Sequence, residues 1–218
     1  MGPQAEASIV SLPAGGGEEQ LITSPTTLTE VAYDWSADGA WILGSSDHQT
    51  PGRTAICLFP ISAAPRAETL MRVVTSHPEY NLWQAHYSPD ERWITFNAIQ
   101  ATEAGVSTIY VIPASGGEWR RITEDKYWDD IPHWSPDGRT IYFVSGRSGF
   151  FNVWGRRFDP TGGKPVGEAF RVTAFESPGQ MMSPRLVQLI GISLAADRLV
   201  LPITEVSGSI WILENVDR

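Results

Sequence analysis

The chain has 218 residues, of which 42% are hydrophobic and 19% charged, so it can bury a core and has an ordinary globular composition. Its formal net charge of −9 argues against a nucleic-acid backbone or an anionic membrane as main partner, because both require clustered Lys and Arg. The single cysteine, Cys57, excludes an internal disulfide and a paired-cysteine metal site.

In chain order, the sequence begins without the basic region or apolar core of a signal peptide, and no transmembrane stretch follows. We therefore expect a protein of the cytoplasm or the periplasm that does not bind a membrane. The first two expected strands lie in residues 7–13 and 14–23, joined by a Gly-rich turn.

An aromatic residue, a Ser, a turn and a second strand then recur about every 50 residues, at Ser36, Ser88 and Ser135. A degenerate fourth copy contains Ser193. Pro, Asp and Gly after each Ser favour a tight turn, and the β-rich run that follows predicts a strand. The aromatic residues are Trp35, Tyr87 and Trp134, and we expect them to be buried between repeats.

Further strands are expected downstream of each copy. Third strands lie at 54–60, 107–113, 151–159 and 208–215, and fourth strands within 67–75, 114–123 and 161–173. No segment of ten or more residues shows convincing helical periodicity. Repeated units of four short antiparallel strands predict an all-β protein, a β-propeller with about four blades present. The single domain, residues 1–218, has blade parts at 7–23, 28–75, 80–123, 128–173 and 183–214.

The blade count leaves two arrangements open. Residues 19–23 could complete the last blade and close a four-bladed ring, or the blades could form the arc of a larger propeller. We favour the arc, because closure would leave residues 7–13 as a spare, exposed edge strand. The open blade edges of an arc would allow dimerisation.

The repeat resembles the WD-like repeat of TolB-type β-propellers. Residues 107–123 and 131–154 carry the likeness best, and it extends over nearly all of 7–214. The ending at 208–218 is similar to that of propellers attached to bacterial kinases or winged-helix regulators, and related propellers cap serine peptidases. The resemblance implies the fold and says little about function.

Three residues in the third copy, His133, Ser135 and Asp137, suggest a hydrolase triad at first sight. However, the Ser and the Asp belong to a turn that recurs around Ser36 and Ser88, and three active sites in one small domain are implausible. We interpret the motif as structural. The Gly-rich turns are likewise interpreted as hairpin turns and not as phosphate loops, since no helix follows them.

Polar and aromatic residues precede the motif in the second and third copies, and we expect them at one mouth of the central channel. The candidate binding residues are Trp83, Gln84, His86, Trp128, Asp129, Asp130 and His133. The alternative without a binding function is a loop with solvated carboxylates and a packed Trp. Asp129, Asp130 and His133 also suggest a metal site, and the two carboxylates a glycosidase, although adjacent acids on one loop usually point apart.

The sequence therefore predicts a non-catalytic binding module, a sensor or scaffold part of a larger bacterial protein. It would engage a protein or peptide partner, or a small ligand, at the channel mouth, with no catalytic residue, metal or cofactor. The alternative is a propeller that gates substrate for a hydrolase of the serine-peptidase type, whose catalytic domain is absent here. A third possibility is an enzyme that works with Asp129, Asp130 and His133.

Overall fold

A computed structural model describes residues 8–23, 28–61, 71–100, 105–177, 180–182, 191–195 and 197–205. Every regular element in these ranges is a β-strand, so the all-β prediction is confirmed. Three four-stranded antiparallel sheets succeed one another along the chain, each with its strands in sequence order. Nothing in the described ranges forms a helix of membrane-spanning length and hydrophobicity.

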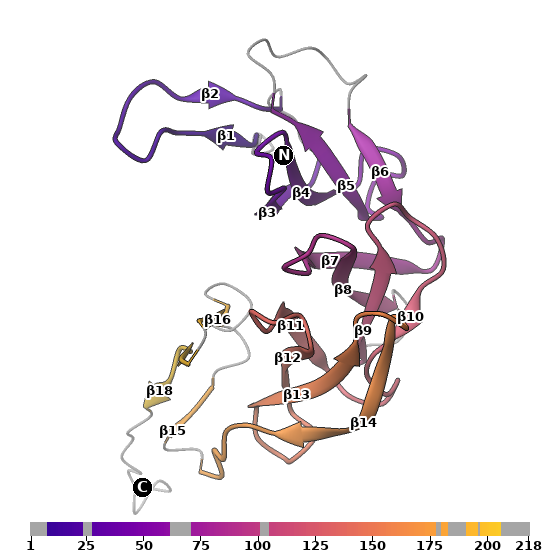
Figure 1. Cartoon of the computed structure of the whole chain (residues 1–218), viewed down its shortest axis with the longest axis vertical. Helices are drawn as coiled ribbons and strands as arrows, with labels where there is room; N and C mark the ends of the chain where they lie inside the picture. The colour runs from indigo at the N-terminus through magenta and orange to yellow at the C-terminus, as the bar shows by residue number, and fades with distance from the viewer. Residues whose placement is uncertain are drawn as a thin grey trace, which may run out of the picture.

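The three sheets are the blades of a propeller. Blade 1 consists of β3 (Glu30–Trp35), β4 (Trp41–Ser46), β5 (Ala55–Pro60) and β6 (Arg72–Thr75). Blade 2 consists of β7 (Tyr80–Tyr87), β8 (Trp93–Gln100), β9 (Ser107–Pro113) and β10 (Arg120–Arg121). Blade 3 consists of β11 (Asp129–Trp134), β12 (Thr140–Ser145), β13 (Asn152–Asp159) and β14 (Lys164–Arg171). The first strands, β3, β7 and β11, lie on the concave side of an arc, and β6, β10 and β14 lie on its convex side (Figure 1).

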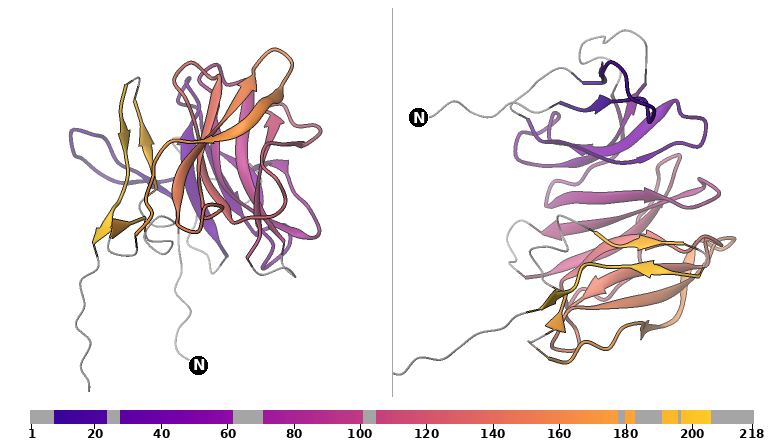
Figure 2. Two further views of the ribbon diagram at one scale, coloured as in Figure 1. Left: turned by 90° about the horizontal axis from the view of Figure 1, so that it is seen from below. Right: turned by 90° about the vertical axis from the view of Figure 1, so that its left-hand side faces the viewer.

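The core lies in layers between the blades. Leu43 of blade 1 and Phe96 of blade 2 are buried in one layer, and Val111 of blade 2 and Phe143 of blade 3 in the next. Figure 2 shows the sheets stacked face to face. Because both faces of a central blade are covered, each blade depends on its neighbours for burial of its apolar side chains.

An N-terminal hairpin, β1 (Val10–Ser11) with β2 (Gln20–Leu21), packs on blade 1. The hydroxyl of Thr23 accepts a hydrogen bond from the N–H of Ile9 at 2.9 Å. Thr123 and Thr173 make the same bond to the third strands of blades 2 and 3. The hairpin is therefore built like the third and fourth strands of a blade, as the sequence predicts.

The C-terminal strands form two separate pairs in the described residues. β15 (Gln180–Met181) pairs with β18 (Thr204–Glu205), and β16 (Ser193–Leu194) pairs with β17 (Leu199–Val200). Neither pair joins β1 or β2, so the strands that the structure describes form an open arc (Figure 1). The third strand predicted at 208–215 lies outside the described residues, and the single domain of residues 1–218 stays a prediction.

The fourth motif copy is shorter than the sequence alignment suggests. The N–H of Ala195 donates to the carbonyl of Arg198 at 2.9 Å, which is the bond that Ser135 makes to Thr140 in blade 3. Ala195 therefore occupies the place of the motif Ser. The alignment on Ser193 is wrong by two residues, because the loop of this hairpin is two residues shorter.

The expected burial of the motif aromatics holds in part. Trp134 is 7% exposed, and Tyr87 is half-buried between blades 1 and 2. Trp35 is 52% exposed, so its predicted burial is wrong. The aromatic residue on a first strand faces the preceding blade, and before blade 1 the described residues supply only the hairpin β1–β2.

Candidate functional site

The motif Ser is a structural element of its turn. The hydroxyl of Ser135 donates to the carboxylate of Asp137 at 2.6 Å and accepts from the N–H of Thr140 at 2.9 Å. The same two bonds recur at Ser88, with distances of 2.7 and 3.0 Å, and at Ser36, with 2.6 and 3.0 Å. Because each hydroxyl links its own turn to the next strand, the predicted structural role of the motif is confirmed.

The Gly-rich segments are hairpin turns, as predicted. The N–H of Gly16 bonds the carbonyl of Pro13 between β1 and β2, and Gly116 bonds Pro113 between β9 and β10. Both glycines have positive φ, of 82° and 87°, which side-chain-bearing residues adopt at a cost.

The first strands of blades 2 and 3 share a bulge, and it positions the candidate site residues. The strand register shifts between Trp83 and His86 in β7, and at the corresponding place in β11. Gln84 and Ile131 sit in these bulges with φ of 53° and 54°. The side-chain oxygen of Gln84 accepts from the N–H of Ile131 at 2.8 Å and so joins blades 2 and 3.

The structure places these candidates on strands and not on a loop. Trp83, Gln84 and His86 lie in β7, Asp129, Asp130 and His133 lie in β11, and Trp128 directly precedes β11. The alternative of a loop with solvated carboxylates is wrong, because the bulge lets pairing with β8 and β12 continue past the polar residues and both carboxylates are buried. Both strands lie on the concave side of the arc (Figure 1).

Asp130 is a buried acceptor and not a free carboxylate. Its Oδ1 accepts from the side-chain amide of Asn97 at 2.8 Å, across the boundary between blades 2 and 3. Its Oδ2 accepts from the indole N–H of Trp128 at 3.1 Å. Asp130 is 3% exposed, so these bonds take the place of its hydration.

Asp129 has a different set of partners. Both of its oxygens accept from one nitrogen of Arg147, at 3.0 and 2.9 Å, and Asp129 is fully buried. The guanidinium carbon of Arg147 lies 5.0–5.2 Å from the ring centroids of Tyr127, Phe143 and Trp154. Burial raises the pKa of Asp129, whereas Ser145 and Arg147 oppose that shift. The two adjacent carboxylates therefore do not act as a pair.

Three ionisable side chains form a line across the blades. Asp34, His86 and His133 each stand two residues before a motif Ser, on β3, β7 and β11. The Nδ1 of His86 is 3.7 Å from the Oδ2 of Asp34, and the rings of His86 and His133 have centroids 4.2 Å apart. We call these three residues the Asp34–His86–His133 row. The side chains of His86 and Asp34 are 20% and 34% exposed.

The pKa values of two members of the row are shifted from their usual values. Burial lowers the pKa of His133 to about 3, with a further contribution from His86 and opposition from Asp34, so His133 is neutral near pH 7. Burial also acts to raise the pKa of Asp34, but the bonds from His86 and from the N–H of Trp35 outweigh it and hold the pKa below its usual value. The row thus contains a charged carboxylate at Asp34 and a neutral imidazole at His133.

The sequence interpretation missed Asp34, Asn97 and Arg147. Asp34 could have been found, because it holds the same repeat position as His86 and His133. Asn97 and Arg147 act through contacts with other strands, which have no local signal. Among the described residues, no group of three or more His, Cys, Asp or Glu is arranged to hold a metal ion.

Comparison with known proteins gives partial relatives. An uncharacterized protein of Agrobacterium fabrum is 32% identical over 151 residues, which is 69% of this chain and 47% of the relative. An uncharacterized peptidase of Bacillus subtilis is 35% identical over 66 residues, and the Tol-Pal system protein TolB of Bordetella pertussis is 49% identical over 45. These matches cover 30% and 20% of this chain and 10% of each relative. The chain thus spans about half the length of the first relative, and no family model matches it.

Solved structures show the fold more completely. TolB from Acinetobacter baumannii matches 93% of this chain and 47% of its own, with a TM-score of 0.66 and 21% identity. A TolB-type protein from Agrobacterium tumefaciens matches 79% of this chain and 56% of its own, with a TM-score of 0.60 and 26% identity. A puromycin-hydrolyzing peptidase of Mycobacterium tuberculosis matches 82% and 29%, with a TM-score of 0.61 and 14% identity. The chain therefore has the fold of the TolB-type β-propellers, and the resemblance inferred from its repeats is confirmed.

Proposed function

We propose that this chain is a non-catalytic binding module that engages a protein or peptide partner, or a small ligand, on the concave side of its arc. The single observation that carries the proposal is the Asp34–His86–His133 row. Three blades contribute one ionisable side chain each from the same repeat position, and the row lies on the innermost strands. Convergent polar groups on a concave face are the usual components of a binding site.

The state of the other candidates supports binding over catalysis. Ser135 is held by its turn, Asp129 by Arg147 and Asp130 by Asn97. A nucleophile or general base must be able to contact the reacting atom of a substrate. The side chains of Ser135, Asp129 and Asp130 are instead hydrogen-bonded to other residues of the fold. Trp83, on the same strand as His86, and Trp128, which donates to Asp130, are half-buried and offer aromatic contact area.

The comparisons support a protein partner. The Bordetella relative is named as a component of the Tol-Pal system, so it works within a set of proteins. Among the described strands, β3, β7 and β11 are also the terminal strands of their sheets. An extended peptide can add to such an edge by main-chain hydrogen bonds.

The test uses the whole chain as bait for a random peptide library, followed by calorimetry with the selected peptides. His86→Ala should weaken binding at least tenfold, because it removes the central member of the row. His77→Ala is the matched control, since the ring of His77 contacts those of Tyr80 and Trp119 outside the row. If His86→Ala folds with an unchanged melting temperature and binds as tightly as the wild type, the proposal fails.

A second candidate is a propeller that gates substrate for a hydrolase. The identity with the Bacillus subtilis peptidase favours it, and the Mycobacterium tuberculosis peptidase shares the fold. A propeller that gates substrate lets peptides pass to the catalytic domain and does not need to form a stable complex with them. The two candidates therefore differ in the same experiment: peptide complexes that depend on His86 favour the binding module, and the absence of any stable complex favours the gate.

A further inference from the structure

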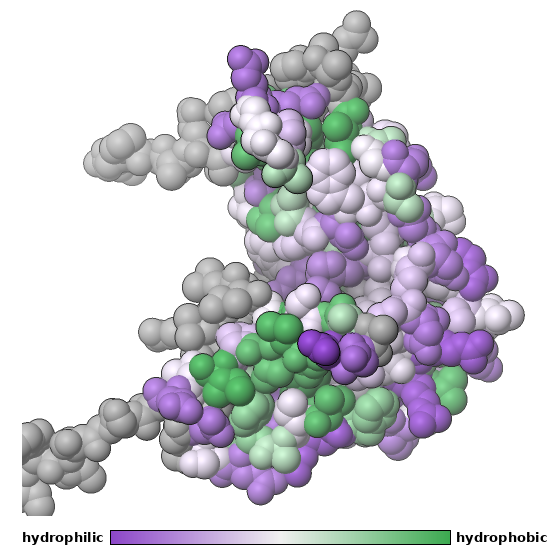
Figure 3. All heavy atoms as spheres, turned by 60° about the vertical axis from the view of Figure 1, so that its left-hand side comes forward, coloured by the Kyte–Doolittle hydropathy of each residue, from purple (hydrophilic) through white to green (hydrophobic). Residues whose placement is uncertain are grey.

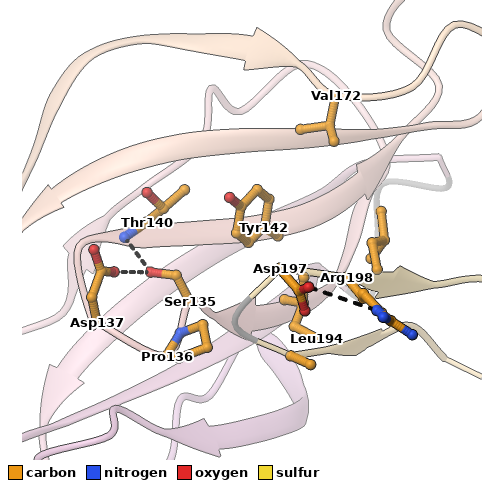
Figure 4. A pocket seen from close by; sticks show the side chains of 11 residues that line it. Ser135, Pro136, Asp137, Thr140, Tyr142, Val172, Leu194, Asp197 and Arg198 are labelled. Carbon is orange, nitrogen blue, oxygen red and sulfur yellow. Dashed lines mark hydrogen bonds and ion pairs between the residues drawn. The ribbon is translucent and has the colours of Figure 1, made fainter.

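A pocket of about 540 Å³ lies between blade 3 and the hairpin β16–β17 (Figure 4). One wall is the motif turn and second strand of blade 3, and the other is the hairpin. The residues that matter below are Asp137, Thr140, Tyr142, Leu194 and Arg198. This pocket is separate from the Asp34–His86–His133 row and does not depend on the proposed function.

The repeat explains why there is a pocket at this place. Between blades 2 and 3 the corresponding space is filled by the indole rings of Trp93 and Trp134, which pack on Phe158 with centroids 5.6 and 5.1 Å away. Trp93 stands five residues after its motif Ser, and Thr140 holds that position in blade 3. Replacement of an indole by a Thr side chain removes most of the volume on one side.

The facing wall is reduced in the same way. Trp134 is the last paired residue of its strand and lies opposite Ile141. Leu194 is the last paired residue of β16 and lies opposite Leu199, so it takes the place of the motif aromatic. The boundary between blade 3 and the C-terminal hairpin therefore lacks both indoles, while its framework of paired strands is retained.

We propose that this pocket binds a planar aromatic ring that carries an N–H or O–H donor, an indole or a phenol, supplied by a Trp or Tyr side chain of a partner or by a free aromatic molecule. The place is one that the fold fills with indoles elsewhere. Its volume is within the roughly 300–1,000 Å³ typical of ligand pockets. The cavity thus lies where the repeat places its indoles between blades 2 and 3.

The polar groups of the pocket suit such a ring. Buried indole N–H groups need an acceptor, and those of Trp93 and Trp134 find the carbonyls of Pro160 and His86, each at 3.1 Å. In the pocket, the carboxylate of Asp137 and the hydroxyl of Tyr142 offer acceptors (Figure 4). Arg198 lines the opposite wall, where its Nε lies 3.7 Å from the carboxylate of Asp197.

Apolar surface continues beyond the pocket. Figure 3 shows hydrophobic side chains gathered on the lower part of this face, over blade 3 and the short strands beside it. The exposed large apolar residues of this region that do not line the pocket are Val166, Phe170, Val200 and Ile203. They would contact the residues that flank a Trp or Tyr in a peptide, and a free ring would not reach them.

The experiment titrates the whole chain with two probes, N-acetyl-tryptophanamide and a short peptide with Trp between apolar residues, and follows binding by NMR. Both should bind the wild type, and tighter binding of the peptide identifies a protein as the source of the ring. Thr140→Trp fills the pocket from its own wall and should weaken both at least tenfold. Thr161→Trp, in the exposed turn between β13 and β14, is the matched control and should bind like the wild type.

Three results would overturn the proposal: no binding of either probe to the wild type at millimolar concentration, unchanged binding to a folded Thr140→Trp variant, or equal binding of N-acetyl-leucinamide. If Thr140→Trp does not fold, Leu194→Trp fills the pocket from the opposite wall and serves in its place.

Discussion

The imidazole rings of His86 and His133 stack across the boundary between blades 2 and 3, with centroids 4.2 Å apart and planes inclined by 33°. Two protonated imidazoles at this distance would repel each other, and burial already disfavours the charged form of His133. The same contact that lines the candidate site therefore couples the joint between two blades to pH.

Acidification should destabilise the fold through His133. The pKa of His133 is about 3 in the folded chain and 6.5 for the exposed group. Between pH 6.5 and pH 3, His133 therefore binds a proton in the unfolded chain and stays neutral in the folded chain. The free energy of unfolding is therefore fully retained above pH 6.5 and decreases as the pH falls toward 3, by about 2 kcal/mol between pH 7 and pH 5. Urea unfolding at pH 7, 6 and 5 measures this.

His133→Gln keeps a planar polar side chain and removes the titrating group. Its free energy of unfolding should depend less on pH in the same window. An identical pH dependence in this variant and the wild type would show that His133 is not the cause.

Asn97→Ala should destabilise the chain by about 2–3 kcal/mol, because it leaves the buried carboxylate of Asp130 without its partner from blade 2. Asn81→Ala is the matched control. Asn81 accepts a bond from the N–H of Thr54 at 3.0 Å, so its loss removes a neutral hydrogen bond and should cost about 1 kcal/mol. Equal losses in urea unfolding would contradict the account of Asp130.

The strands could be predicted from the sequence because the determinants are local and repeated. Each motif Ser bonds residues two and five positions away, so its turn is readable in one short window. The candidate site is different in kind. Asn97 and Asp130 are 33 residues apart and meet only because blades 2 and 3 stack, so their pairing has no signal in the sequence.

The exposure of Trp35 is a second property that the sequence could not predict. Its position in the repeat is the same as that of Trp134, yet it is 52% exposed and Trp134 is 7% exposed. The difference lies in what precedes each blade, which no local pattern encodes. The repeats therefore predict the strands of each blade well. Which side chains a neighbouring blade covers can be seen only in the structure.

Trp35→Ser and Trp134→Ser should therefore differ in their effect. Loss of the buried ring of Trp134 removes its packing on Phe158 and its bond to His86, and should cost about 3–5 kcal/mol. Loss of Trp35 should change stability by less than about 1 kcal/mol. Melting curves compare the two, and a similar loss would show that Trp35 is covered in solution.

The open ends of the arc also bear on Trp35. If copies of the chain associate through these ends, Trp35→Ser should lower the dimer fraction in sedimentation experiments, because it removes exposed apolar area at one end. A dimer fraction that is unchanged by the substitution would exclude this end as the contact.

Gly163 makes the sharpest stability test of the joint between blades 2 and 3. It has a φ of +61°, and a Cβ at this position would collide with the ring of Trp93 and the guanidinium of Arg120. Arg120 also donates to the carbonyl of Gly163 at 2.7 Å. Gly163→Ala must adopt a left-handed conformation and displace side chains of blade 2, so a loss of about 3 kcal/mol or more is expected.

Gly167 supplies the comparison, because it has nearly the same φ of +65° and a Cβ there would meet nothing within 4 Å. Gly167→Ala carries the backbone strain alone and should cost about 1–2 kcal/mol. The difference between the two variants in urea unfolding isolates the close approach of Trp93 and Arg120 to the β13–β14 turn. If the two variants lost the same free energy of unfolding, the prediction would be wrong. Blades 2 and 3 would then be packed more loosely in solution than the contacts of Gly163 with Trp93 and Arg120 imply.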